Sequence, residues 1–223
     1  MSKINFIHVP KTGGTYFHHC VLRHNKQKIK DLGHAFCYQA AAYNWKTWIQ
    51  STKYQKRLNK WTDLPVFQFN KDELYHTIVR NPFELFYSYY SYQGNDGSKG
   101  WGNVNEIHSF HTFNDFVEFY LSENTWHLPV LKKSLFAMIK DRHNNFIIND
   151  YIKYDRNNFQ SKIISYCNRN DLKFKQSNDH RDLNTNKDTD YYKKHYRRQY
   201  TDNQVQRLSD LWQDDLKYFN YSF

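Results

Sequence analysis

Hydrophobic and polar positions follow two periodicities along the chain, one typical of strands and one typical of helices. Short apolar, β-branched runs predict three buried strands, at residues 4–9, 74–79 and 145–152. Apolar residues at helical spacing predict seven helices, the first capped by Thr15 and the fourth opened by the capping box Thr112-x-x-Asp115. These helices cover residues 15–24, 39–59, 83–92, 112–121, 128–139, 157–168 and 202–218. Strands that alternate with helices predict an α/β fold with a central, mainly parallel sheet flanked by helices.

The composition fits one domain over residues 1–223. No Pro/Gly/Ser-rich linker and no abrupt shift in composition divides the chain. Hydrophobic residues make up 39% of it, with 17 Phe, 19 Tyr and 6 Trp, so its core can be large and rich in aromatic rings.

The chain is basic, with a net charge of +10 from 32 Lys and Arg against 22 Asp and Glu. Such a surface suits an anionic partner: a nucleotide, a nucleic acid, an acidic glycan or an anionic membrane face. A solvated surface rich in Lys and Asn, without any such partner, explains the charge equally well.

Cysteine usage and the N-terminal residues bear on the compartment. Cys20, Cys37 and Cys167 form no paired or C-x-x-C pattern, which favours a reducing environment. The chain opens on a strand instead of a signal peptide, and no apolar run approaches the ~20 residues that cross a bilayer. We therefore expect a cytoplasmic protein without a membrane span.

A loop with anion-binding features joins the first strand to the first helix, Pro10-Lys11-Thr12-Gly13-Gly14-Thr15. In such a turn successive backbone N–H groups point at a ligand, the helix start adds partial positive charge, and glycines allow a close approach. Lys11 precedes the glycines, whereas in the Walker A motif G-x-x-x-x-G-K-[ST] the lysine follows them. This order argues against an ATPase, a GTPase or a nucleotide kinase. The same residues also fit an ordinary strand-to-helix turn.

A second candidate element follows the strand at residues 74–79. Arg80 stands at the carboxyl end of that strand, where a guanidinium can bind phosphate through two hydrogen bonds. Ser88 lies two helical turns further on and can donate to the same group. Taken alone, the two residues fit a surface arginine and an ordinary helical serine.

Both elements resemble those of a known family. Residues 6–15, Phe-Ile-His-Val-Pro-Lys-Thr-Gly-Gly-Thr, closely resemble the 5′-phosphosulfate loop of sulfotransferases that use 3′-phosphoadenosine-5′-phosphosulfate (PAPS). Residues 77–88 resemble the 3′-phosphate element, although Asn81 and Leu85 stand where aspartate and a second arginine are common. The final helix also resembles that of the family, with Asn220 in place of a glycine. The nearest branch is that of the carbohydrate (heparan 2-O-type) and related bacterial and viral enzymes.

The resemblance implies a P-loop-like three-layer fold and transfer of a sulfuryl group from PAPS to a hydroxyl, with adenosine 3′,5′-bisphosphate as the product. The resemblance also implies that Lys11 stabilises the bridging oxygen of PAPS as the sulfuryl group leaves. The residues it assigns to the cofactor are Lys11, Thr12, Gly13, Gly14, Thr15, Tyr16, Arg80 and Ser88.

The acceptor hydroxyl needs a general base, and histidine has a suitable pKa without much tuning. His34 occupies the place of a Gly-His in the resembled branch and is the preferred base, although a capping or core role is an alternative. Glu84 is a carboxylate alternative, but its charge would be awkward beside a 3′-phosphate. His18 and His19 are adjacent on a helix and face different directions, and no metal motif is present, so we expect no metal.

The acceptor itself is expected to be a glycan, because the resembled branch acts on glycans and indole faces suit sugar rings. The candidate acceptor-binding residues are Trp101, Trp126, His127, Arg197 and Arg198. Each also fits a packed aromatic or a solvated basic face. Protein tyrosine and a small alcohol or lipid headgroup stay open as acceptors. A basic nucleic-acid-binding module is the alternative class, although no nucleic-acid-binding motif supports it, and the oligomeric state is not readable from the sequence.

Overall fold

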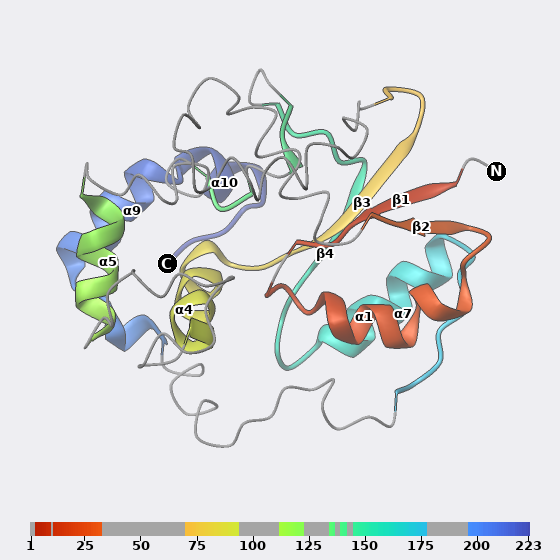
Figure 1. Cartoon of the computed structure of the whole chain (residues 1–223), viewed down its shortest axis with the longest axis horizontal. Coiled ribbons are helices and arrows are strands. Elements are labelled where there is room, and N and C mark those ends of the chain that lie inside the picture. Colours follow the sequence, from red (N-terminus) through yellow and green to blue (C-terminus); the bar gives the residue numbers. More distant parts are fainter. Residues whose placement is uncertain are drawn as a thin grey trace, which may run out of the picture. The chain divides into compact units, whose positions relative to one another are not determined.

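The computed structural model describes residues 3–9, 11–32, 70–93, 112–122, 134–136, 139–141, 145–177 and 196–223. The chain divides into two compact units, and each is described by itself (Figure 1). The first unit comprises Met1–Val79 and Phe136–Leu183, and the second comprises Arg80–Leu135 and Asn184–Phe223. The prediction of one domain over the whole chain stays a prediction.

A parallel sheet of four strands forms the centre of the first unit. Its strands are β1 (Ile4–Ile7), β2 (Ile29–Asp31), β3 (Leu74–Val79) and β4 (Asp150–Lys153). Their order is β2-β1-β3-β4, and each neighbouring pair is parallel. The predicted α/β fold with a central parallel sheet flanked by helices is therefore confirmed.

Strands β1 and β3 are buried almost throughout, as is usual in a parallel sheet covered on its faces. The polar residues of β3 have partners inside the sheet and on α7 (Phe159–Arg169). The Thr77 hydroxyl donates to the carbonyl of Ile7 at 2.8 Å, and Nδ1 of His76 lies 2.6 Å from the hydroxyl of Tyr166. Burying these groups is therefore offset by hydrogen bonds.

Two helices pack on the sheet of the first unit, α1 (Gly14–Cys20) and α7 (Figure 1). The ring of Phe17 on α1 stacks on Phe6 of β1 at 4.5 Å and meets Tyr166 of α7 edge-on at 5.7 Å. These rings join Ile78 and Ile152 of the sheet in one hydrophobic core.

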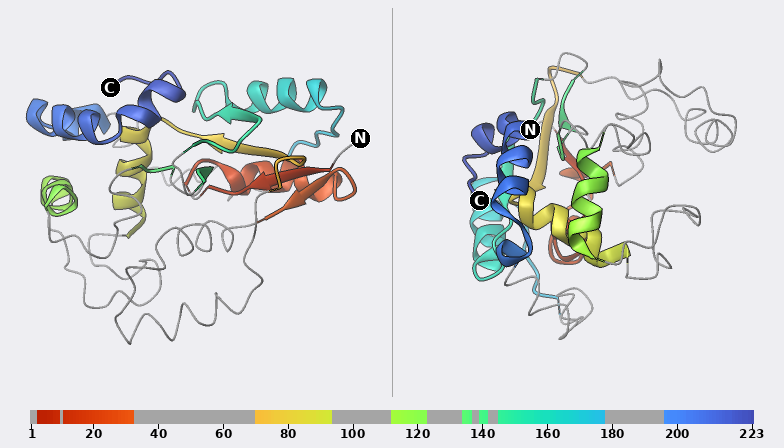
Figure 2. Two further views of the ribbon diagram at one scale, coloured as in Figure 1. Left: turned by 90° about the horizontal axis from the view of Figure 1, so that it is seen from above. Right: turned by 90° about the vertical axis from the view of Figure 1, so that its left-hand side faces the viewer.

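The second unit is helical in its described residues, and Figure 2 gives two further views of its helices. It contains α4 (Pro82–Gln93), α5 (Phe113–Leu121), the 3₁₀ turn η4 (Tyr196–Gln199), α9 (Asp202–Leu211) and α10 (Gln213–Tyr218). Its core is aromatic: Phe86 lies 4.5 Å from Tyr120 and 5.3 Å from Trp212, ring centre to ring centre. The indole N–H of Trp212 donates to the Tyr120 hydroxyl at 3.1 Å.

Several predicted elements differ from the observed ones. Helix α1 ends at Cys20 and is followed by a 3₁₀ turn over Leu22–His24, and its cap is Gly13, not Thr15. The third predicted strand begins later than expected, because residues 145–149 form an isolated bridge and a bend before β4. Strand β2 was not predicted.

Two predicted helices also need correction. The last one is two helices, interrupted at the fully buried Trp212. Residues 135 and 136, predicted helical, form a turn. The capping box Thr112-x-x-Asp115 is confirmed, since both of its hydrogen bonds are present. The predicted helix over residues 39–59 lies outside the described residues.

Candidate active site

The loop after β1 has an unusual backbone. Two of its residues have positive φ, Lys11 at 63° and Gly13 at 93°. Glycine adopts this region freely, but for a lysine the left-handed conformation costs about 1–2 kcal/mol. Strain of this kind is concentrated at functional sites, where the surroundings must hold it in place. Lys11, to which the family resemblance assigns stabilisation of the leaving group, is thus held in a costly conformation.

Thr12 ties the loop to the strand before it. Its side chain is fully buried, and its hydroxyl donates to the carbonyl of Val9 at 2.8 Å. The hydroxyl proton of Thr12 is therefore donated to the protein's own backbone. Thr15, in contrast, is exposed on the first turn of α1.

Gly13 is packed too closely to carry a side chain. A Cβ added there would lie 2.7 Å from Cε1 of Phe159 and 3.0 Å from Cδ2 of Tyr154. Real Cβ atoms essentially never approach other atoms to less than 3.0 Å. The Gly13 backbone therefore rests directly on the aromatic start of α7 and the residue after β4.

Tyr16, assigned to the cofactor from the sequence, has its side chain in the core of the first unit. It is 6% exposed, and its ring lies 6.0 Å from that of Phe159.

Strand β4 ends on a lysine, Lys153. Burial, and then the positive charge of Lys162, lower the pKa of Lys153. Both causes disfavour the charged ammonium group. An anion nearby would favour the charged form and would raise this pKa. Lys153 immediately precedes Tyr154, which contacts Gly13. Nothing in the sequence pattern singled out Lys153.

The second element, residues 80–88, begins the second unit. Arg80 is 6% exposed, and its Nη2 lies 2.6 Å from Oε1 of Glu84, which stands one helical turn further on. Ser88, two turns after Arg80, is 2% exposed. The spacing of four residues places these side chains on one face of the helical segment. Glu84, which seemed awkward beside a phosphate, is instead the ion-pair partner of the arginine.

The two departures from the family pattern in this element have local structural reasons. The Asn81 side chain accepts a hydrogen bond from the backbone N–H of Phe83 at 3.0 Å, and donates to the carbonyl of Ser222 at 2.7 Å. An aspartate would keep the first bond and lose the second. Leu85 is fully buried, so a second arginine at its position would place a charge in the core.

Of the candidate acceptor residues, Arg197 and Arg198 lie exposed on η4. The Arg197 guanidinium stands over the rings of Phe223 and Tyr196, at 5.7 and 6.0 Å. The candidate base and the other acceptor residues, namely His34, Trp101, Trp126 and His127, lie outside the described residues, as does Pro10.

Two kinds of feature are absent from the described residues. In these ranges no three His, Cys, Asp or Glu side chains gather in a way that could hold a metal ion. No helix in the same part of the chain combines the length and apolar character needed to span a membrane.

Fold and loop together define an α/β protein with a strained, lysine-bearing loop at the carboxyl end of a parallel strand. Comparison with protein families makes this specific: residues 1–222 match the model of the sulfotransferase family, and the chain belongs to that family. It therefore transfers sulfuryl groups. This reaction needs a hydroxyl-bearing acceptor, and the family generally uses PAPS as the donor. Searches among curated proteins and solved structures found no match.

Proposed function

We propose that the protein is a PAPS-dependent O-sulfotransferase that sulfates a hydroxyl of a glycan, and that it acts in the cytoplasm. The observation that carries the proposal is the conformation of Lys11, a lysine held at a φ of 63° in the loop after β1. Backbone strain of this kind is concentrated at functional sites, which supports a functional role for Lys11.

In this mechanism the backbone N–H groups of residues 12–15 bind the 5′-phosphate, and Lys11 faces the oxygen that bridges phosphorus and sulfur. The acceptor oxygen attacks sulfur as the bond between sulfur and the bridging oxygen breaks. Lys11 stabilises the negative charge that develops on that oxygen, and His34 takes the proton of the acceptor hydroxyl. The products are a sulfate ester and adenosine 3′,5′-bisphosphate.

Arg80 and Ser88 bind the 3′-phosphate in this proposal. Arg80 is buried and already oriented by Glu84, so little side-chain entropy is lost when it binds the phosphate. A 3′-phosphate distinguishes PAPS from ATP and AMP, and this element would therefore set the nucleotide specificity.

The glycan acceptor is supported by the likeness of the chain to the carbohydrate branch, by Trp101 and Trp126, and by the exposed position of Arg197 and Arg198. Arginines suit the carboxylate or sulfate groups of an acidic glycan. Radiolabelled PAPS offered with a sulfated glycan, a tyrosine peptide and a small alcohol would separate the acceptor classes. Labelling of the peptide or the alcohol alone would contradict the glycan proposal.

Thermal unfolding with different nucleotides tests the central proposal. A ligand at one hundred times its Kd stabilises the native state by about 2.7 kcal/mol, which for a chain of this size raises Tm by about 5–10 °C. We expect adenosine 3′,5′-bisphosphate to give this shift and ATP and AMP to give much less. A preference for ATP, or no shift with any of the three, would overturn the proposal.

The Arg80→Ala variant provides the matched control. Each shift in Tm is measured against the ligand-free variant. A lower intrinsic stability of the variant therefore does not affect the comparison. The variant should lose the advantage of adenosine 3′,5′-bisphosphate over AMP while its weak response to AMP stays the same. An unchanged preference would remove Arg80 from the 3′-phosphate site.

A further inference from the structure

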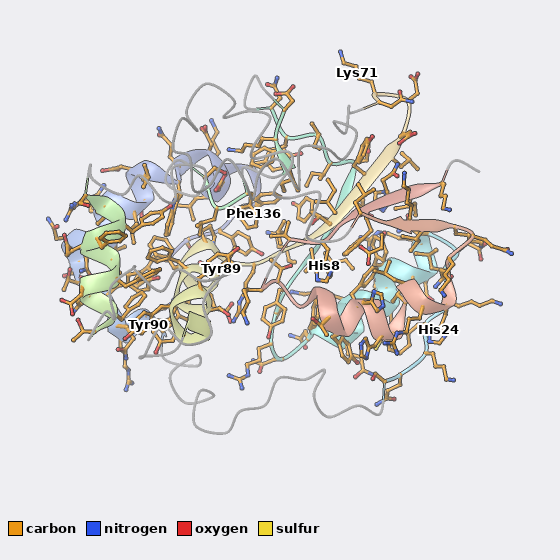
Figure 3. The ribbon with its side chains drawn as sticks, viewed as in Figure 1. His8, His24, Lys71, Tyr89, Tyr90 and Phe136 are labelled. Atoms are coloured by element: carbon orange, nitrogen blue, oxygen red, sulfur yellow. The ribbon has the colours of Figure 1, made fainter. Side chains whose placement is uncertain are left out.

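His8 is packed directly over a glycine of the loop. A Cβ added to Gly14 would collide with the imidazole ring of His8, in overlap with Nε2 and Cδ2 and 2.9 Å from Cε1. The ring thus occupies the space that a side chain at residue 14 would need. Figure 3 labels His8 beside the start of α1.

The His8 ring adjoins the core as well as the loop. Its centre lies 6.2 Å from that of Phe6, which is 1% exposed and stacks on Phe17 of α1. A row of rings therefore leads from the buried face of α1 through Phe6 to His8, and ends on the backbone of Gly14. Because Phe6 and Phe17 are fixed in the core, His8 is held from that side.

The two glycines of the loop are packed by different elements. Gly13 meets Phe159 and Tyr154, whereas Gly14 meets His8 alone among the atoms nearest to its missing Cβ. The loop also contains two residues with positive φ, and such a backbone persists only where its surroundings determine it.

We propose that His8 is a positioning residue of the phosphosulfate loop, whose ring holds the backbone of residues 11–15 in its ligand-binding conformation by filling the space over Gly14. The inference rests on the proposed function, since it assigns the loop to PAPS. It gives His8 a role through shape and not through proton transfer. The phenylalanine variant should therefore replace it and the alanine variant should not.

The first experiment measures the contact without any ligand, in a double-mutant cycle followed by thermal unfolding. His8→Ala, Gly14→Ala and the double variant are compared with the wild type. Gly14→Ala should lower Tm, because its Cβ collides with the ring. The double variant should unfold at a higher temperature than Gly14→Ala, because the ring is gone.

Gly13→Ala is the matched control, since its added Cβ meets Phe159 and Tyr154 instead of His8. Adding His8→Ala to Gly13→Ala should lower Tm further and rescue nothing. If His8→Ala rescues both glycine variants, or neither, the specific contact between His8 and Gly14 is disproved.

The second experiment measures the Kd of adenosine 3′,5′-bisphosphate by calorimetry at a temperature where every variant is folded. His8→Ala should weaken binding about tenfold, and His8→Phe should stay within about threefold of the wild type. Equal binding by His8→Ala and the wild type would overturn the positioning role, and so would equal losses in both variants. A wild type that binds no adenosine 3′,5′-bisphosphate would contradict the proposed function, while the unfolding cycle still reports on the contact.

Discussion

Replacing Lys11 by alanine and by glycine separates two properties of this residue, its charge and its backbone conformation. Both variants lose the ammonium group. Only glycine also relieves the strain of a φ of 63°, since alanine keeps a Cβ. The two variants should therefore agree in activity and differ in stability.

The difference in stability follows from two opposing terms. The left-handed conformation costs a residue with a Cβ about 1–2 kcal/mol, and glycine removes this cost. Glycine also gives the unfolded chain more freedom, which destabilises the native state by about 0.4–1 kcal/mol. The Lys11→Gly variant should thus be more stable than Lys11→Ala by about 0.8 kcal/mol, or roughly 2–3 °C in Tm for a chain of this length.

The loss of activity follows from the charge. Removing one group that stabilises a developing oxyanion typically lowers kcat by about 10²–10³. Sulfuryl transfer from PAPS, measured on the acceptor identified for the wild type, should fall by this factor in both variants. Scanning calorimetry on the same preparations gives the two values of Tm.

Either half of this reasoning can fail alone. If Lys11→Ala keeps kcat within tenfold of the wild type, the ammonium group is not part of the mechanism. If Lys11→Gly unfolds at or below the Tm of Lys11→Ala, the loop is not strained at this residue.

Three further predictions concern stability and reactivity. Burial lowers the pKa of His76 from its ordinary value of 6.5, so the unfolded chain binds a proton that the folded chain resists. Stability should be fully present above pH 6.5 and fall below it, and the denaturant midpoint should fall less for His76→Gln between pH 7.5 and 5.5; identical slopes would contradict this. Asn81→Asp removes the donor to the Ser222 carbonyl and should cost about 1 kcal/mol in urea unfolding, whereas an unchanged midpoint would show that this bond contributes nothing. Burial raises the pKa of Cys167 from 9.0 to about 11, so alkylation at pH 8, followed by peptide mass spectrometry, should be roughly a hundredfold slower in native than in urea-unfolded protein; comparable rates would refute the burial of its thiol.

The parts of the fold that the sequence predicted are those with strong local signals. Strand β3 and the capping box at Thr112 depend on residues close together in the chain, and both were found as expected. Strand β2 was missed because only Ile29 of its three residues is buried, so it shows no apolar run. The break at Trp212 was missed because the apolar spacing continues across it.

The residues of the candidate site also divide into those with a local sequence signal and those without one. The loop and the Arg80 element were recognised from contiguous residues. Within the loop, the backbone of Lys11 has an unusual, positive φ. The packing of His8 on Gly14 depends on how the chain turns between them, and a motif read as letters carries no such contact. Asn81 was read as a departure from the pattern because its partner, Ser222, lies at the other end of the sequence.

Gly13 and Gly14 are equivalent letters in the sequence, but they differ in how they could be replaced in evolution. The three atoms nearest to an added Cβ at Gly14 all belong to His8, so a smaller residue at position 8 would remove the closest obstacle to alanine. Gly13 is constrained twice, by its φ of 93° and by the rings of Phe159 and Tyr154. No single compensating substitution would relieve both constraints. Among related sequences, residues 8 and 14 should therefore vary together, while position 13 should stay glycine wherever the ring of Phe159 is retained.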